Sequence, residues 1–134
     1  MNKKLLLVIS FFILFGGFSA YAVDYYSKAT GVLNNPNTWG TNTDGSGTIP
    51  ANFSTAGDVF YVRNNPNPTI NGSWSVVKLV IGDGINPCNF LITGVYALTS
   101  TVDISANATL TLEGTSQQGT IIWGSLAIIS TVNY

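Results

Sequence analysis

The sequence predicts an all-β fold and, within that class, a right-handed parallel β-solenoid (a β-helix) that follows an N-terminal apolar helix. Apolar and polar residues alternate along many short stretches, and clusters of Asn, Gly and Pro separate these stretches. No stretch after residue 22 shows the 3.6-residue period of a capped amphipathic helix. An antiparallel β-sandwich is the alternative that the same observations leave open.

The first 22 residues have the three-part pattern of a secretory signal peptide. Lys3 and Lys4 precede an apolar run at residues 5–15, and Ala20 and Ala22 place small side chains at the two positions that a signal peptidase recognises. The apolar run is shorter than the roughly 20 residues that a membrane span needs. We therefore predict a signal helix over residues 1–22 that is cleaved after Ala22. The protein is then secreted or held at the cell surface, with no membrane span after cleavage.

The mature chain, residues 23–134, is long enough for one domain with a modest core. The whole chain has five basic and six acidic residues, so loss of Lys3 and Lys4 leaves three basic residues and a formal charge of −3. Three scattered cations cannot neutralise the phosphates of a nucleic acid, which excludes nucleic acid as a partner. The high content of β-branched and aromatic residues argues against disorder.

Period-two alternation predicts the individual strands. It is clearest at residues 76–81, where Val77, Leu79 and Ile81 form the apolar set, and at residues 101–105 and 109–113. Other strands are expected at residues 59–63, 90–93, 120–123 and 126–132.

Turn-forming clusters lie at residues 34–37, 44–47, 64–68, 71–72 and 82–84. Asn and Gly tolerate a left-handed backbone and Pro fixes φ, so these clusters end strands. The tetrapeptide Asn-Asn-Pro-Asn occurs at residues 34–37 and 64–67, which we interpret as reused turn chemistry rather than a structural repeat. Residues 70–73, with Asn-Gly at their centre, are a candidate β-hairpin turn.

The chain divides into three segments on this evidence. Residues 1–22 are the signal peptide, residues 23–57 a turn-rich N-terminal cap, and residues 58–134 the solenoid coils. Residues 121–123 and 126–129 are apolar, and no charged residue follows Glu113. An exposed apolar edge strand invites aggregation, so we expect downstream coils of a longer parent protein, or a partner, to cover this edge.

Residues that carry catalytic chemistry are scarce. The absence of histidine excludes Ser-His-Asp and Cys-His triads and histidine-ligated metals. Ser75 and Lys78 match an S-x-x-K pattern, but that pattern needs a helix and here falls in a predicted strand. Asp58 is interpreted as a strand-start residue and Asp103 as a solvent-facing one, rather than as an acid/base pair for glycoside cleavage.

Cys88 is the only cysteine, so no intrachain disulfide can form. We predict that it behaves as a small buried apolar residue rather than as a reactive thiol.

Calcium is the one metal that the sequence suggests, and only weakly. Asn42, Asp44 and Ser46 place oxygen atoms at positions 1, 3 and 5 of a loop, with Gly47 at position 6. Position 12 is Phe53, where a bidentate acid belongs, so the segment is not an EF-hand. An Asx-type turn without a bound ion is the favoured interpretation.

Trp39 is the candidate for a carbohydrate contact. Aromatic rings can stack on sugars, although more often they fill protein cores. Trp39 lies beside predicted turns, so we expect it at the surface, where it could contact glycans.

Several segments, in order, resemble the N-terminal part of secreted bacterial surface proteins of the type IX secretion class. They are YYSKATG at residues 25–31, TWGTNTDGSG at 38–47, VRNN at 62–65, VIGDG at 80–84, TVDISANATL at 101–110 and STVNY at 130–134. The spacing of Thr38-Trp39-Gly40, Pro50 and Gly57-Asp58-Val59 is more loosely similar to G8-type domains that open parallel β-helices. The resemblance implies a long, adhesin-like β-solenoid protein of which this chain is the first part.

The function expected from the sequence is therefore structural. We predict a secreted or cell-surface, adhesin-like segment without catalytic activity or cofactor, whose partners are surface glycans or other surface proteins. A carbohydrate-binding module, or a fragment of a polysaccharide-degrading solenoid enzyme, is the alternative.

Overall fold

The computed structural model describes residues 21–113, 119–127 and 131–133, and within them the chain forms β-strands and almost no helix. The strands are β1 (Asp24–Ser27), β2 (Trp39–Gly40), β3 (Val59–Val62), β4 (Trp74–Ile81), β5 (Cys88–Ile92), β6 (Leu98–Ile104), β7 (Ala108–Leu112), β8 (Ile121–Leu126) and β9 (Thr131–Asn133). A short 3₁₀ turn, η1, spans Pro36–Thr38. The prediction of a predominantly β protein is confirmed for these residues.

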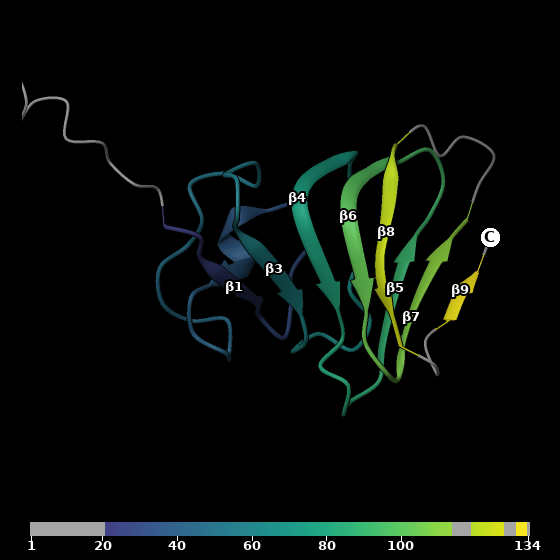
Figure 1. The fold of residues 1–134 in the computed structure, drawn as a ribbon, viewed down its shortest axis with the longest axis horizontal. Coiled ribbons are helices and arrows are strands. Elements are labelled where there is room, and N and C mark those ends of the chain that lie inside the picture. The colour runs from purple at the N-terminus through teal and green to yellow at the C-terminus, as the bar shows by residue number, and fades with distance from the viewer. Residues whose placement is uncertain (1–20, 114–118, 128–130, 134) are drawn as a thin grey trace, which may run out of the picture.

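The strands form two sheets (Figure 1). Sheet A has the order β2-β1-β3-β4-β6-β8, and sheet B has the order β5-β7-β9. From β4 onward the chain passes alternately from one sheet to the other. Strands β4 to β7 therefore each pair in parallel with the strand two places further along the chain, so that β6 lies between β4 and β8 and β7 lies between β5 and β9.

The predicted right-handed parallel β-solenoid is wrong as a description of this fold. Sheet A is mixed, because β1 and β2 pair antiparallel with Ser27 opposite Trp39. The cause is the turn before β2, where the Asn35 side chain accepts a hydrogen bond from the N–H two residues on and Pro36 opens η1. This turn returns the chain alongside β1. The antiparallel sandwich is also wrong, since every other pair of named strands is parallel.

Two local predictions also fail. The β-hairpin expected at residues 70–73 does not form, because β3 and β4 on either side of it pair in parallel, with Phe60 opposite Leu79. The single strand expected at residues 126–132 is divided, since β8 ends at Leu126 in sheet A and β9 begins at Thr131 in sheet B. Both errors concern where the chain goes after a turn, which depends on contacts distant in sequence.

The hydrophobic core is built from alternate residues of both sheets. On β3, β5, β6 and β7 every second side chain is buried, as the period-two pattern requires. The most fully buried of these side chains are Phe60, Val62, Phe90, Ile92, Leu98, Val102 and Leu110. Their removal from water is the main stabilising contribution to the fold.

Strand β4 changes face within its length. Trp74 and Val76 are buried in its first part, and Leu79 and Ile81 in its second. The register with β6 shifts between Ser75 and Lys78, which marks a β-bulge. Because the bulge inserts a residue, the expected apolar set is wrong at its first member: Val76 is buried and Val77 only half-buried.

An aromatic cluster closes the core at its N-terminal end. Trp39 packs edge-on to Phe60 at 5.2 Å between ring centroids, and Phe53 packs edge-on to Trp74 at 5.1 Å. Tyr25 stacks on Phe60 at 5.1 Å. These rings come from β1, β2, β3, β4 and one loop, so the segment before β3 is held to the rest of the molecule by aromatic packing.

The predicted signal peptide lies almost entirely outside the described residues. Of the two small residues at the expected cleavage site, Ala20 lies outside them and Ala22 is exposed. Among the described residues, no helix is long and apolar enough to cross a membrane.

Candidate functional site

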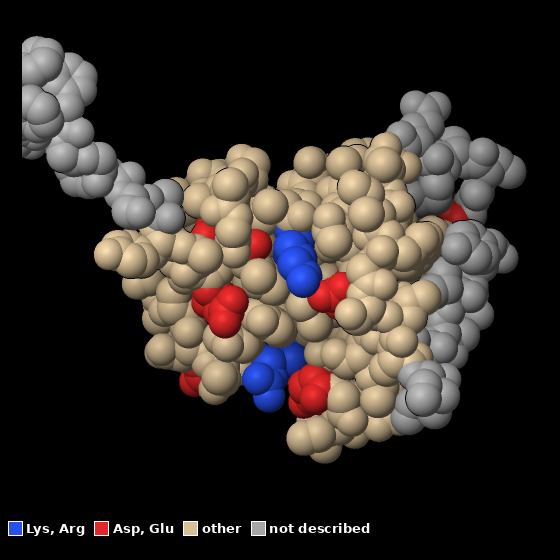
Figure 2. Space-filling model, viewed as in Figure 1, with Lys and Arg blue, Asp and Glu red and all other residues tan. Residues whose placement is uncertain are grey.

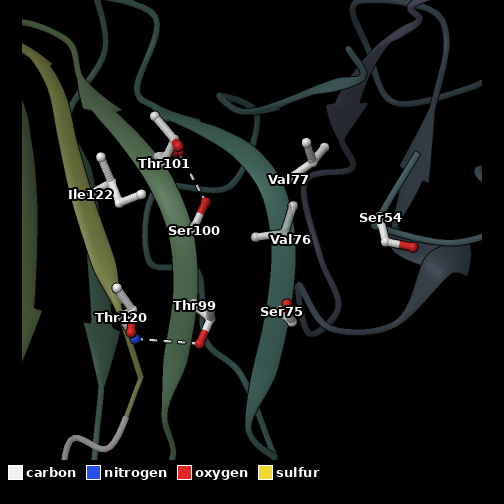
Figure 3. Close-up of a pocket in the computed structure, with 9 residues that line it drawn as sticks. All are labelled: Ser54, Ser75, Val76, Val77, Thr99, Ser100, Thr101, Thr120 and Ile122. Carbon is white, nitrogen blue, oxygen red and sulfur yellow. Dashed lines mark hydrogen bonds between the residues drawn. The ribbon is translucent and has the colours of Figure 1, made fainter. Parts of the chain in front are cut away.

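A groove on sheet A is larger than a second depression at the carboxyl ends of β3 and β4. It has a volume of about 310 Å³ and crosses β4, β6 and β8 (Figure 3). Its lining consists of Ser54, Ser75, Val76, Val77, Thr99, Ser100, Thr101, Thr120 and Ile122. It lies at the β4 bulge, where the register between β4 and β6 shifts.

The chemistry of this groove is that of neutral hydroxyl groups beside aliphatic side chains. The Thr99 hydroxyl accepts a hydrogen bond from the Thr120 N–H at 3.4 Å, and the Ser100 hydroxyl donates to the Thr101 carbonyl at 2.9 Å. No residue of the lining titrates near neutral pH. The groove can therefore form hydrogen bonds with a polar ligand, but it holds no general acid or base.

The second depression lies at the carboxyl ends of β3 and β4 and has a volume of about 190 Å³. Tyr61, Arg63 and Asp83 are its titratable lining residues. Burial and the nearby Asp24 carboxylate raise the pKa of Tyr61, which keeps the phenol neutral. The Arg63 guanidinium lies 5.7 Å from the centre of the Tyr26 ring. Arg63 therefore forms part of the surface packing.

Both signs of charge are mixed on the face shown in Figure 2, where blue and red atoms lie side by side. Lys78 on β4 and Asp103 on β6 form an ion pair of 2.8 Å. Burial raises the pKa of Asp103, but the hydrogen bonds from Lys78 and from the Ser125 N–H outweigh it and the net pKa is lowered. Asp103 therefore links three neighbouring strands, β4, β6 and β8, through charge-assisted hydrogen bonds.

The expectation that Trp39 lies at the surface is wrong. Its side chain is fully buried, and its indole N–H donates a 2.7 Å hydrogen bond to the Leu33 carbonyl. Trp39 is therefore a core residue with a satisfied polar group, and no sugar can stack on it in this fold. Trp74 is also buried, whereas Trp123 on β8 is 37% exposed.

The three calcium candidates come together in the loop after β2, but they bond to one another. Asp44 Oδ1 accepts hydrogen bonds from both the N–H and the hydroxyl of Ser46, at 2.9 and 2.6 Å, and these bonds lower the pKa of Asp44. The Asn42 amide donates to the Ser46 hydroxyl at 3.0 Å. This is the geometry of the Asx-type turn that the sequence favoured. A turn without a bound ion remains the expectation for this loop, and calorimetry at millimolar calcium tests it.

The loop is tight because residue 40 is a glycine. A Cβ atom there would collide with the carbonyl groups of Gly45 and Ser46. Gly45 itself has a φ of 83°, which glycine adopts without strain. These two glycines allow the tight shape of the loop.

The structure also shows where Cys88, the Ser75 and Lys78 pair and the carboxylates lie. Cys88 is 1% exposed, as predicted. Ser75 and Lys78 lie on strand β4, so the helix that an S-x-x-K site needs is not formed there. The carboxylates are dispersed, and no group of three or more Cys, Asp or Glu side chains suited to a metal ion occurs in the part of the chain that the structure describes.

Asp58 lies at a strand start, as predicted, but it is buried, which the sequence does not indicate. It precedes β3 and is only 4% exposed, and its Oδ1 accepts a 2.9 Å hydrogen bond from the Val23 N–H. The serines and threonines of the groove were also missed as a group, because their proximity arises from the pairing of β4, β6 and β8. The outward positions of alternating strands were the available signal.

Comparisons with known proteins identify no relative of this chain. No family model, no curated protein and no solved structure matches this chain.

Proposed function

We propose that this protein is an exported, non-catalytic structural segment of the bacterial cell surface, adhesin-like in its role, which assembles through the open edge of sheet A. The signal-peptide pattern of residues 1–22 supports export. The resemblance to surface proteins of the type IX secretion class, carried by the segments given above, supports the location. A groove lined only by hydroxyl and aliphatic groups supports a task without catalysis.

The observation that carries the structural role is the exposed apolar edge strand β8. Ile122 is 60% exposed, Leu126 50% and Trp123 37%. The strand ends sheet A and contains no charged residue or proline, the devices by which edge strands usually prevent pairing. Such an edge offers both backbone hydrogen-bonding groups and apolar side chains to another strand.

A second copy of this chain is the occupant that fits this edge. The opposite edge of sheet A is β2, which has two residues, both buried. Within sheet A, β8 is the open edge, and it can pair with β8 of another copy about a two-fold axis, which gives a closed dimer. The dimer would join two six-stranded sheets into a continuous one, as suits a scaffold.

Sedimentation velocity of the processed protein tests this assembly. We expect a dimer whose fraction rises with concentration, and we expect Ile122→Lys to make the protein monomeric because it places a charge on the edge. Ile85→Lys is the matched control: Ile85 is 76% exposed in the loop between β4 and β5, so this variant should dimerise like the parent. A parent protein that is monomeric at all concentrations, or equal behaviour of the two variants, would contradict the proposal.

Carbohydrate binding is the second candidate, and the hydroxyl-lined groove is the observation that favours it. Six of its nine lining residues carry hydroxyl groups. Such hydrogen-bonding groups can bind the hydroxyls of a sugar. Trp123 on β8 does not line the groove, but its indole is 37% exposed on a strand that does, so it can report binding through its fluorescence. Titration of surface glycans against tryptophan fluorescence tests this function, and a flat response would count against it.

A further inference from the structure

The buried carboxylate of Asp58 has no described cationic partner. Of the side chains that the structure describes, Asp58 is the one charged group that is buried, with 4% of its surface exposed. The ion pair found among these residues joins Lys78 and Asp103. A buried carboxylate is costly unless it is paired and hydrogen-bonded, so its position before β3 needs an explanation.

The Val23 nitrogen already lies against this carboxylate. The Val23 N–H donates to Asp58 Oδ1 at 2.9 Å. The Val23 carbonyl in turn accepts a 3.0 Å hydrogen bond from the Val59 N–H, and the next residue, Asp24, is paired with Val59 in the parallel ladder of β1 and β3. The Val23 nitrogen is therefore held in place by strand pairing on one side and by Asp58 on the other.

Val23 is also the first residue after the expected cleavage site. Signal peptidase hydrolysis adds one water across the Ala22–Val23 bond. The Ala22 carbonyl carbon gains the oxygen and becomes a carboxylate, and the Val23 nitrogen leaves as an amine that is protonated at neutral pH. The residues before it contribute little packing, since Tyr21 is 85% exposed and Ala22 is exposed.

We propose that Asp58 is a built-in receptor for the α-ammonium group that signal cleavage creates at Val23. This inference rests on the export and cleavage included in the proposed function. Cleavage converts a neutral hydrogen bond into a charge-assisted one between the same two atoms, and such bonds are about twice as strong. The processed chain then gains an ion pair that fastens β1 to the start of β3, and the precursor lacks it.

The neighbouring charges determine whether the stability contributed by the pair of the Val23 ammonium and Asp58 rises or falls with pH. Asp24 and Tyr25 on β1 are the other titratable groups next to it, and burial, followed by the Asp58 charge, raises the pKa of Tyr25. An anionic Asp58 stabilises the ammonium form, so the α-amine should titrate above its ordinary value of about 7.7–8.0. Its contribution to stability is complete below that ordinary value and is lost as the pH rises through the raised pKa.

The test uses the exported protein, with its N-terminus identified by Edman sequencing. The pKa of the α-amine is then measured from the pH dependence of reductive methylation, followed by NMR of the methyl label. We expect a first residue of Val23 and an α-amine pKa raised by about one unit or more. In Asp58→Asn the pKa should return to its ordinary value.

A second variant guards against misfolding of Asp58→Asn. Insertion of one glycine between Ala22 and Val23 moves the amine one residue away from Asp58 and leaves every core side chain unchanged, so its pKa should also be ordinary. An amine of ordinary pKa on a chain that begins at Val23 would overturn the inference and leave export standing. A first residue other than Val23 would overturn it as well, and an intact Met1 would overturn export too.

Discussion

The thiol of Cys88 lies among backbone groups at the start of β5. Its sulfur is 3.7 Å from the carbonyl oxygens of both Val62 and Asn65, and the residue is 1% exposed. Burial raises the pKa of the Cys88 thiol to about 11. The thiolate, which is the reactive form, is therefore rare at neutral pH.

This environment predicts slow alkylation of the folded protein. At pH 8, iodoacetamide should modify Cys88 about 100-fold more slowly in the native state than in urea, because a pKa raised from 9.0 to about 11 lowers the thiolate fraction by about that factor. Mass spectrometry of quenched samples measures both rates. Equal rates would show that the thiol is accessible in the native protein.

Turn chemistry is the property that the sequence predicts best at this scale. In both copies of Asn-Asn-Pro-Asn the second asparagine accepts a hydrogen bond from the N–H two residues on, at 3.0 Å for Asn35 and 3.1 Å for Asn65. The interaction is local, so four residues determine it. The burial of Trp39 could not be predicted in this way, since it depends on packing with Phe53, Phe60 and Trp74 from later segments.

At the scale of the elements, alternation in the sequence predicts where β4 lies but not which of its side chains are buried. The pattern located the strand, but a period of two cannot reveal a bulge, which moves every later side chain to the opposite face. The register between β4 and β6 is set by both strands together. Alternation in the sequence therefore does not determine which of Val76 and Val77 has its side chain in the core.

The facing of the second half of β4 can be tested with two adjacent alanine variants. Leu79 is fully buried and Val80 is half-buried. Leu79→Ala should lower the free energy of unfolding by about 2–4 kcal/mol, because it leaves a cavity in the core. Val80→Ala should cost less than about 1 kcal/mol. Urea denaturation measures both, and the reverse order would contradict the register described here.

The ion pair between β4 and β6 predicts a pH-dependent contribution to stability. The net pKa of Asp103 is lowered, so its contribution is present above the unfolded value of about 3.9 and is lost as the pH falls through the folded value. The hydrogen bond to Asp103 raises the pKa of Lys78, so its contribution is lost only as the pH rises through that raised value. The pair is therefore intact between about pH 4 and pH 10.

Lys78→Met tests this window. At pH 7 the variant should melt a few degrees below the parent, since Lys78 is 40% exposed and such pairs contribute less than about 1 kcal/mol. The difference should shrink as the pH falls through the lowered pKa of Asp103, because a protonated Asp103 no longer pairs with Lys78. Lys28→Met is the control: Lys28 bonds to the Asn37 carbonyl, which does not titrate, so its effect should be independent of pH. A pH-independent effect of Lys78→Met would refute the pair.

At the scale of the whole molecule, composition and alternation predicted the class and most strands, but not the architecture. Strands β4 to β9 lie alternately in sheets A and B, which agrees with the prediction of short strands separated by polar corners. The antiparallel return of β2 along β1 was missed, because β1 is short and β2 has only two residues. Their pairing is favoured by the burial of Trp39, a contact that no local pattern contains.

The candidate groove and the contact between Val23 and Asp58 also depend on the fold of the whole molecule. Residues more than twenty positions apart meet in the groove, and Val23 and Asp58 are separated by 35 positions. Such proximity follows from strand register, which the sequence alone does not determine. The sequence does predict a cleavage site after Ala22, and this expected site gives the Val23–Asp58 contact its significance.

The proposed surface function and the proposed Val23–Asp58 ion pair both depend on export of the processed chain. The location of the protein in intact cells tests export most directly. Antibodies raised against residues 23–134 should label unpermeabilised cells or recover the protein from the medium, and the recovered chain should lack residues 1–22. Protein found only in the cytoplasm after lysis, with Met1 still attached, would contradict the account.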